Sequence, residues 1–208
     1  MPHLFEPHVK PVDIAELRPT QMTVGMREVR LKREGWKAIK AERRPDFLGR
    51  HMVPVAIGPK ERLYLVDHHH LVRALNEEGI RHVLTSIVAD LSHLGKDEFW
   101  SVMDNLSLVH PFDADGVRQP VTVLPREIGG LVDDPFRSLA GALREAGGFA
   151  KVTVPFSEFL WADFLRRRLE RKRVMQSFEL ALPEAMRLAR SREAAHLPGW
   201  CGSSRQDA

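Results

Sequence analysis

Residues 63–74 read Leu-Tyr-Leu-Val-Asp-His-His-His-Leu-Val-Arg-Ala, and the pattern of the chain changes in the middle of this stretch. The four apolar residues before Asp67 are typical of a short buried strand. Aspartate is a common helix N-cap, and apolar side chains then recur at helical spacing as far as Gly79, a residue type that often ends a helix. We therefore predict a strand, a cap at Asp67 and a helix over residues 68–78.

Short apolar runs before and after this stretch predict a small mixed sheet. Residues 51–58 and 62–67 are two such runs separated by a Gly-Pro-Lys-Glu turn, which predicts two neighbouring strands. The β-branched composition of a later run favours another strand, and helical spacing of apolar residues elsewhere favours helices. The further strands are predicted at residues 12–21 and 83–90. One helix, or two short ones separated near Gly35, is predicted at residues 26–44, and another helix at residues 95–103.

The chain becomes mainly helical after a long irregular connection. Residues 109–131 contain three prolines and three glycines, too many breakers for a long helix or strand. Asp134 followed by Pro135 is a typical helix start, and a second helix is predicted over residues 158–173. The expected organisation is a mixed α+β domain at residues 10–110, a helical extension packed on it at residues 111–195, and a disordered tail at residues 196–208.

The composition indicates a cytoplasmic protein with one principal core. The chain has 208 residues and is 43% hydrophobic, which is enough for one sizeable core. A single cysteine, Cys201, excludes an intramolecular disulfide and favours a reducing compartment. The first residues lack the basic and apolar regions of a secretory leader, and no run reaches the length of a membrane helix. We therefore expect a cytoplasmic location and no membrane contact.

Positive charge is concentrated in two stretches, although the net charge is only +3. Residues 27–50 carry nine Lys or Arg against four Asp or Glu, and residues 161–175 carry six against two. Such runs most often lie on solvated helix faces. They are also the pattern with which proteins bind nucleic-acid phosphates.

Three consecutive histidines follow Asp67 at the predicted helix start. Imidazoles titrate near neutral pH, and the free N–H groups of a helix N-terminus bind anions, so phosphate is the candidate ligand of the triplet. Successive helical residues point about 100° apart, so His68, His69 and His70 cannot all reach one metal ion. Neither a Cys-x-x-Cys nor a His-Glu-x-x-His motif supports a zinc site. The alternative is a structural role in capping or in the core.

The quoted stretch resembles the signature of the ParB/sulfiredoxin superfamily, in which an Asp-Gly pair, a short polar group and an arginine begin a helix in many members. The chain resembles in particular the putative ParB-like nuclease family. That resemblance covers residues 10–170 and includes residues 12–25, 134–140 and 155–164. It implies an α+β fold of the ParB/sulfiredoxin type, a small mixed sheet with helices, followed by a mainly helical C-terminal part.

The resemblance also implies a phosphate pocket at the start of the helix. Relatives bind CTP, phosphorylate a sulfinic acid with ATP, or transfer phosphate from ADP to free serine, so ATP, ADP and CTP are candidate ligands. His69 and His70 match phosphate-binding or catalytic positions of the serine kinases. His68 stands where relatives have glycine, and Leu71 where many have the phosphate-binding arginine, which makes Arg73 the candidate replacement. The sulfiredoxin cysteine is absent from the motif.

Two classes of function are open at this point. The first is an enzyme, a nuclease or a nucleotide-dependent phosphotransferase, with His69 and His70 on the phosphate oxygens and Asp67 orienting the loop or a metal. Glu28 is a candidate general base or ligand of Mg²⁺ or Mn²⁺, because phosphoryl transfer needs a carboxylate near the nucleophile or the metal. The alternative is a non-catalytic module that binds a nucleotide or DNA. The sequence identifies neither a metal-ligand set nor an oligomeric state.

Overall fold

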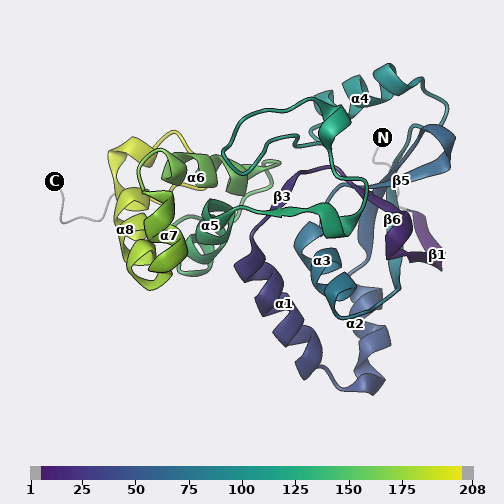
Figure 1. The fold of residues 1–208 in the computed structure, drawn as a ribbon, viewed down its shortest axis with the longest axis horizontal. Coiled ribbons are helices and arrows are strands. Elements are labelled where there is room, and N and C mark those ends of the chain that lie inside the picture. Colours follow the sequence, from purple (N-terminus) through teal and green to yellow (C-terminus); the bar gives the residue numbers. More distant parts are fainter. Residues whose placement is uncertain (1–5, 203–208) are drawn as a thin grey trace. The chain divides into compact units, whose positions relative to one another are not determined.

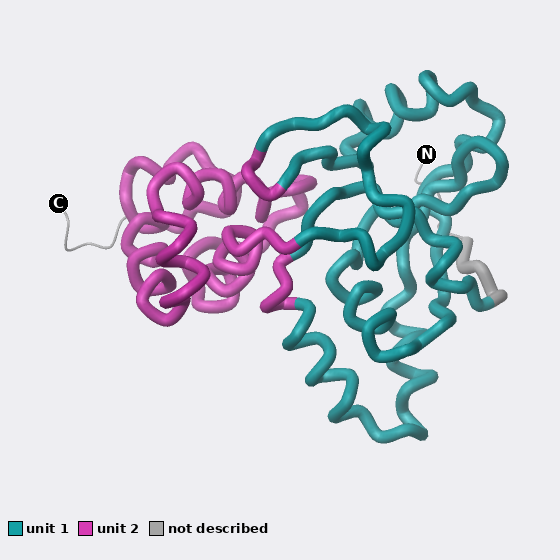
Figure 2. The backbone as a smooth tube through the Cα atoms, viewed as in Figure 1, with its two compact units in different colours: residues 1–24, 29–113, 117–132 teal, residues 25–28, 114–116, 133–208 magenta. Residues whose placement is uncertain are grey.

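The computed structural model describes residues 6–202, and only the backbone of residues 6–10. Contacts divide the described chain into two compact units, which Figure 2 colours separately. Unit 1 contains residues 6–24, 29–113 and 117–132, and unit 2 contains residues 25–28, 114–116 and 133–202. The sequence pattern favours a division at residue 110, whereas in the structure most of the irregular connection belongs with the sheet.

Unit 1 is built on a five-stranded mixed sheet with the strand order β1-β6-β4-β5-β2 (Figure 1). The β1–β6 and β4–β5 pairs are antiparallel, and the β4–β6 and β2–β5 pairs are parallel. The strands are β1 (Glu6–Asp13), β2 (Leu17–Pro19), β4 (Val53–Gly58), β5 (Arg62–Leu65) and β6 (His82–Asp90). The predicted mixed sheet is therefore confirmed.

Four helices accompany these strands in the chain. They are α1 (Met26–Ala38), α2 (Arg44–Arg50), α3 (His69–Glu77) and α4 (Lys96–Asn105), and the first three residues of α1 belong to unit 2. The predicted helical region at residues 26–44 thus forms α1 and leads into α2. Trp36 of α1 is buried and packs edge-on against Phe47 of α2, with ring centroids 5.7 Å apart.

The hairpin of β4 and β5 presents two different faces. Successive side chains of a strand point to opposite faces, so Arg62 and Tyr64 share one face and Leu63 and Leu65 share the other. Tyr64 packs against Phe99 of α4, with ring centroids 4.7 Å apart. Leu65, on the opposite face, is fully buried. The face that carries Arg62 and Tyr64 is therefore the face that meets α4.

The start of α3 differs from the expected capping arrangement. The helix begins at His69, and its N-cap position is His68, whose φ of 65° lies in the left-handed region. Asp67 does not cap the helix; its Oδ1 accepts the backbone N–H of His68 at 2.6 Å. Glycine adopts positive φ without steric penalty, which gives a physical reason for the glycine that relatives have at this position.

The connection after α4 is irregular, as predicted. It contains the short 3-10 turns Val121–Val123 and Ile128–Gly130 and isolated bridges of His110 with Gln21 and of Phe112 with Arg118. At its end, β7 (Val132–Asp133) and β3 (Thr23–Val24) form a small two-stranded sheet. The backbone of the connection is thus tied to unit 1 by single bridges and turns.

Unit 2 is helical and contains α5 (Pro135–Glu145), α6 (Ser157–Arg166), α7 (Arg171–Gln176) and α8 (Phe178–Arg190). Asp134 caps α5 as predicted and accepts the Phe136 N–H at 2.9 Å. Burial raises the pKa of Asp134, although the Arg166 guanidinium at 2.6 Å opposes this shift. The single helix predicted over residues 158–173 is instead two helices, because the chain turns at Leu169, which is buried.

The core of unit 2 surrounds Trp161, which is fully buried and stacks on Phe149 with centroids 4.4 Å apart. The Trp161 Nε1–H donates to the Pro198 carbonyl at 2.8 Å, so part of the expected tail packs on this core. Residues 203–208 of that tail lie outside the described residues. Both units together give the α+β class that the sequence predicts. Of the helices that the structure describes, none is long and apolar enough to cross a membrane.

Candidate functional site

His69, a predicted catalytic residue, is hydrogen-bonded to the backbone directly after β2. The Thr20 backbone N–H donates to His69 Nε2 at 3.3 Å, and the Thr20 hydroxyl donates to the Leu65 carbonyl at 2.8 Å. The His110 N–H donates to the Thr20 carbonyl at 2.8 Å. Thr20 and His69 are 1% and 3% exposed. Nε2 is the acceptor in this hydrogen bond, so it carries no proton in this arrangement. In this arrangement His69 positions the chain directly after β2.

The other residues of the triplet lie at different depths. His70 is buried, His68 is half-buried, and Asp67 is exposed. Their catalytic and phosphate-binding roles stay predictions. Within the described part of the chain, no group of three His, Cys, Asp or Glu side chains could hold a metal ion. Mg²⁺ and Mn²⁺ therefore stay predictions.

Arg73, the candidate phosphate ligand, is engaged with the protein. Its Nη1 donates to the carbonyls of Ile128, Gly129 and Leu131 at 3.2, 2.8 and 3.0 Å. Its Nε donates to Glu77 at 2.7 Å. These bonds link α3 to the end of the irregular connection, so Arg73 fixes the position of that segment.

Glu28 lies in unit 2, not with the other predicted site residues. Its Oε2 is 3.5 Å from Nη1 of Arg137, a buried arginine. Arg137 and Arg144 both form ion pairs with Glu158. Glu28 therefore belongs to an ionic network of the helical unit, and its role as a general base or metal ligand stays a prediction.

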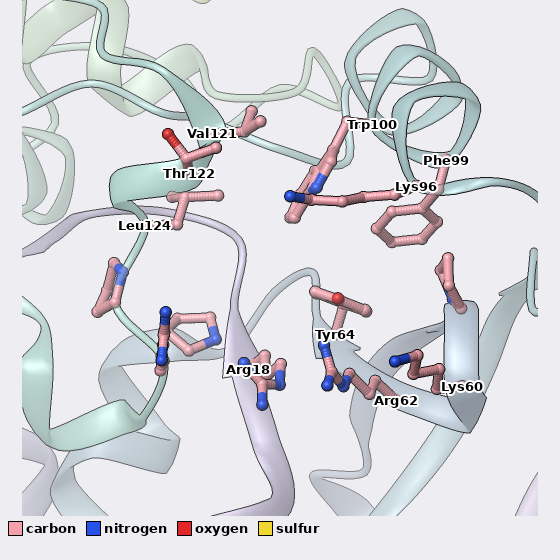
Figure 3. A pocket seen from close by; sticks show the side chains of 14 residues that line it. Arg18, Lys60, Arg62, Tyr64, Lys96, Phe99, Trp100, Val121, Thr122 and Leu124 are labelled. Carbon is pink, nitrogen blue, oxygen red and sulfur yellow. The ribbon is translucent and has the colours of Figure 1, made fainter.

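A cavity of about 470 Å³ opens on the face of the sheet that meets α4 (Figure 3). Its walls come from four separate segments of unit 1: the end of β2, the β4–β5 turn with β5, the first turn of α4, and residues 121–126. Five of its lining residues are cationic: Arg18, Lys60, Arg62, Lys96 and Arg126. We call this cavity the cationic pocket.

The five cations of the cationic pocket are without an acidic partner in the part of the chain that the structure describes. None of their side chains forms an ion pair or hydrogen bond with a described residue, and none of the described lining residues is Asp or Glu. Glu61, Asp97 and Glu98 are neighbours in sequence, but they are exposed and do not line the cavity. Other arginines of unit 1, such as Arg33 and Arg73, are paired with acids. An unpaired cationic cluster around a cavity is suited to an anionic ligand.

Aromatic rings form another part of the lining. Tyr64, Phe99 and Trp100 pack against one another, with centroid distances of 4.7–5.3 Å between the three rings. Gly58 makes this packing feasible, because a Cβ at this position would lie 2.6 Å from Tyr64 and 2.7 Å from Phe99. From the sequence alone, Gly58 is predicted only as part of a turn, and its role in ring packing is not evident.

The turn that presents Lys60 to the cavity is strained. Lys60 and Glu61 both have positive φ, 63° and 55°, which is unfavourable for residues with a Cβ by about 1–2 kcal/mol each. Backbone strain of this kind persists where the surrounding structure imposes it, and it is concentrated at functional sites.

Replacing Lys60 by glycine tests whether the turn is strained. We expect Lys60→Gly to raise the free energy of unfolding by about 0.5–1 kcal/mol, because glycine tolerates positive φ. It should also weaken the binding of a phosphate-bearing ligand, because one cation is lost. Lys60→Ala is the matched control, which removes the charge and keeps the strain. Urea unfolding and fluorescence anisotropy measure the two effects; a glycine variant no more stable than the alanine variant would contradict the strain argument.

The comparisons with known proteins agree with the class that the fold defines, a ParB-like α+β domain. The sequence pattern of the family described as putative ParB-like nuclease matches residues 10–167, so the chain belongs to this family. Among solved structures, the crystal structure of protein Atu1540 from Agrobacterium tumefaciens is similar. It shares 61% sequence identity with a TM-score of 0.90, and the match covers 97% of this chain and 100% of that one. No curated protein matches the chain.

Proposed function

We propose that this protein binds nucleic acid and holds its backbone phosphates in the cationic pocket. The observation that carries the proposal is a group of five cations around one cavity, with no acidic partner among the described residues. A polyanion satisfies several such cations at once, and the release of its counterions adds to affinity. Membership of the putative ParB-like nuclease family also supports a nucleic-acid ligand.

The binding proposal is tested with a double variant of the cationic pocket. We expect Arg18→Ala/Arg62→Ala to weaken binding of a labelled oligonucleotide by about tenfold or more, because two charge-assisted phosphate contacts are lost. Arg187→Ala/Arg190→Ala is the matched control, since both arginines are exposed and lie outside the cavity and outside the two basic stretches. Fluorescence anisotropy at low salt measures the affinities. Equal losses in the two double variants would reject the pocket as the site.

The same assay also tests whether free nucleotides bind in the cationic pocket. ATP, ADP and CTP are added as competitors, since nucleotide-dependent phosphotransfer is the other reaction that the family resemblance implies. Displacement of the oligonucleotide by one of them at a concentration near its physiological level would favour a nucleotide as the ligand of the cationic pocket. Equal and weak displacement by all three favours the nucleic-acid proposal.

Cleavage of the bound strand is a second candidate function. The exposed Asp67 carboxylate is the candidate base: it does not line the cavity, but it follows β5 by two residues, and β5 supplies Arg62 and Tyr64 to the cavity. A carboxylate in such a position can act as a base toward water. Single-stranded and duplex DNA and RNA are incubated with the protein, with and without Mg²⁺ or Mn²⁺. Products that form equally with Asp67→Asn would remove Asp67 from this role.

A further inference from the structure

The cationic pocket has two kinds of wall, and they lie on different sides. Figure 3 shows the side chains of Arg18 and Arg62 together on one side, while Trp100 and Lys96 lie across the cavity from them. Lys96 and Trp100 are four residues apart on α4, so they share one face of the helix. A ligand in this cavity therefore meets cations on one side and an indole ring beside a cation on the other.

The Trp100 ring is held in place by its neighbours. It packs at 82° on Tyr64, with centroids 5.3 Å apart, and at 65° on Phe99, with centroids 5.0 Å apart. Tyr64 and Phe99 are buried, at 8% and 0% exposure, whereas Trp100 is only half-buried. A half-buried indole on a rigid aromatic base offers a preformed surface for another flat ring.

We infer that the cationic pocket takes an unpaired nucleobase against Trp100, so that the preferred ligand is single-stranded nucleic acid. This inference rests on the proposed phosphate-binding function and adds the class of ligand. Proteins that bind single strands combine a cationic groove for the backbone with aromatic side chains on which bases stack. Both features are present here within one cavity.

Anionic ligands that expose no base use only part of this lining. Inorganic phosphate and polyphosphate engage the cations and leave the indole without a partner. In a duplex the bases are stacked inside, and contacts with the backbone alone position a protein without using an aromatic surface. A cavity of about 470 Å³ is also within the range of about 300–1,000 Å³ that is typical of small-ligand sites. Its size therefore suits one exposed nucleotide of a strand.

The test separates the base from the backbone. Anisotropy is measured for the full-length protein with an oligothymidylate, an abasic strand of equal length and a duplex of equal length. We expect the wild type to bind the oligothymidylate about tenfold more tightly than the abasic strand, as the stacking of one base implies. Trp100→Leu should remove this preference and leave the affinity for the abasic strand unchanged. Trp100→Phe should keep most of it, because a ring remains.

The control is Trp200→Leu, the same substitution at a half-buried tryptophan of unit 2 outside the cavity. Urea unfolding confirms that each variant is folded. An oligothymidylate affinity that Trp100→Leu leaves unchanged, or a wild type that binds the abasic strand equally well, overturns the inference. If Arg18→Ala/Arg62→Ala still weakens binding in that case, the phosphate-binding proposal stands alone. A wild type that binds none of the three strands overturns both.

Discussion

Arg73→Met is expected to lower the free energy of unfolding by about 1–3 kcal/mol, because it removes a half-buried charged donor and leaves its acceptors unsatisfied. The wild-type guanidinium is bonded to three backbone carbonyls and to Glu77. Methionine has a similar apolar stem and none of the donors. Urea unfolding followed by circular dichroism measures the change.

The control for this prediction is Arg81→Met. Arg81 is also paired with an acid, Asp13, but its side chain is 77% exposed, and exposed ion pairs contribute about 0–1 kcal/mol. If Arg73→Met is no more destabilising than Arg81→Met, Arg73 does not anchor the connection.

Arg73 does not line the cationic pocket, but it bonds to the segment that forms one of its walls. Residues from 121–126 line the cavity. Arg73 donates hydrogen bonds to carbonyls of residues 128–131, which follow directly in the same connection. Arg73→Lys, which keeps the charge and loses the planar fork, should recover only part of the stability. Its oligonucleotide affinity should recover in parallel with its stability, since Arg73 acts by positioning this wall.

His69→Ala is expected to be comparably destabilising, by about 2–3 kcal/mol. The substitution leaves the Thr20 backbone N–H without its acceptor in a buried place and opens a cavity where the ring was. His69→Gln should recover at least half of the loss, because its side-chain carbonyl can accept the Thr20 N–H. Thermal and urea unfolding measure the change, and His93→Ala, at an exposed histidine, is the control.

The His69 variants also distinguish a positioning role from a catalytic one. If His69 only positions the end of β2, His69→Gln keeps both the fold and whatever oligonucleotide binding or cleavage the wild type shows. Loss of cleavage by a stably folded His69→Gln variant would instead support the catalytic role that the family resemblance implies.

The sequence predicts much of the local structure of both units, because the relevant signals are local. The strand-to-helix change near Asp67, the β4–β5 hairpin and the cap at Asp134 each depend on neighbouring residues. The cap at Asp67 was wrong by one position, because His68 takes the left-handed conformation that the family signature gives to glycine. With histidine at this position, the sequence does not indicate that the backbone is left-handed there.

The cationic pocket could not be predicted in the same way, because its walls are far apart in the chain. Four strands and three α-helices lie between Arg18 and Trp100 in the chain, so no local pattern joins these two residues. Two local signals were available: alternation in β5 places Arg62 and Tyr64 on one face, and helical spacing places Lys96 beside Trp100. The three adjacent histidines are the more conspicuous local pattern, but none of them lines the cationic pocket, and His69 and His70 are buried.

The most direct test of phosphate binding in the cationic pocket is the salt dependence of single-strand affinity, compared between the wild type and Arg18→Ala/Arg62→Ala. For single strands, the slope of log K against log salt concentration decreases by about 0.7 for each phosphate contact that is lost. We predict a slope for the double variant that is shallower by about 1.4 if each arginine contacts one phosphate. Identical slopes for the two proteins would contradict phosphate binding at this site.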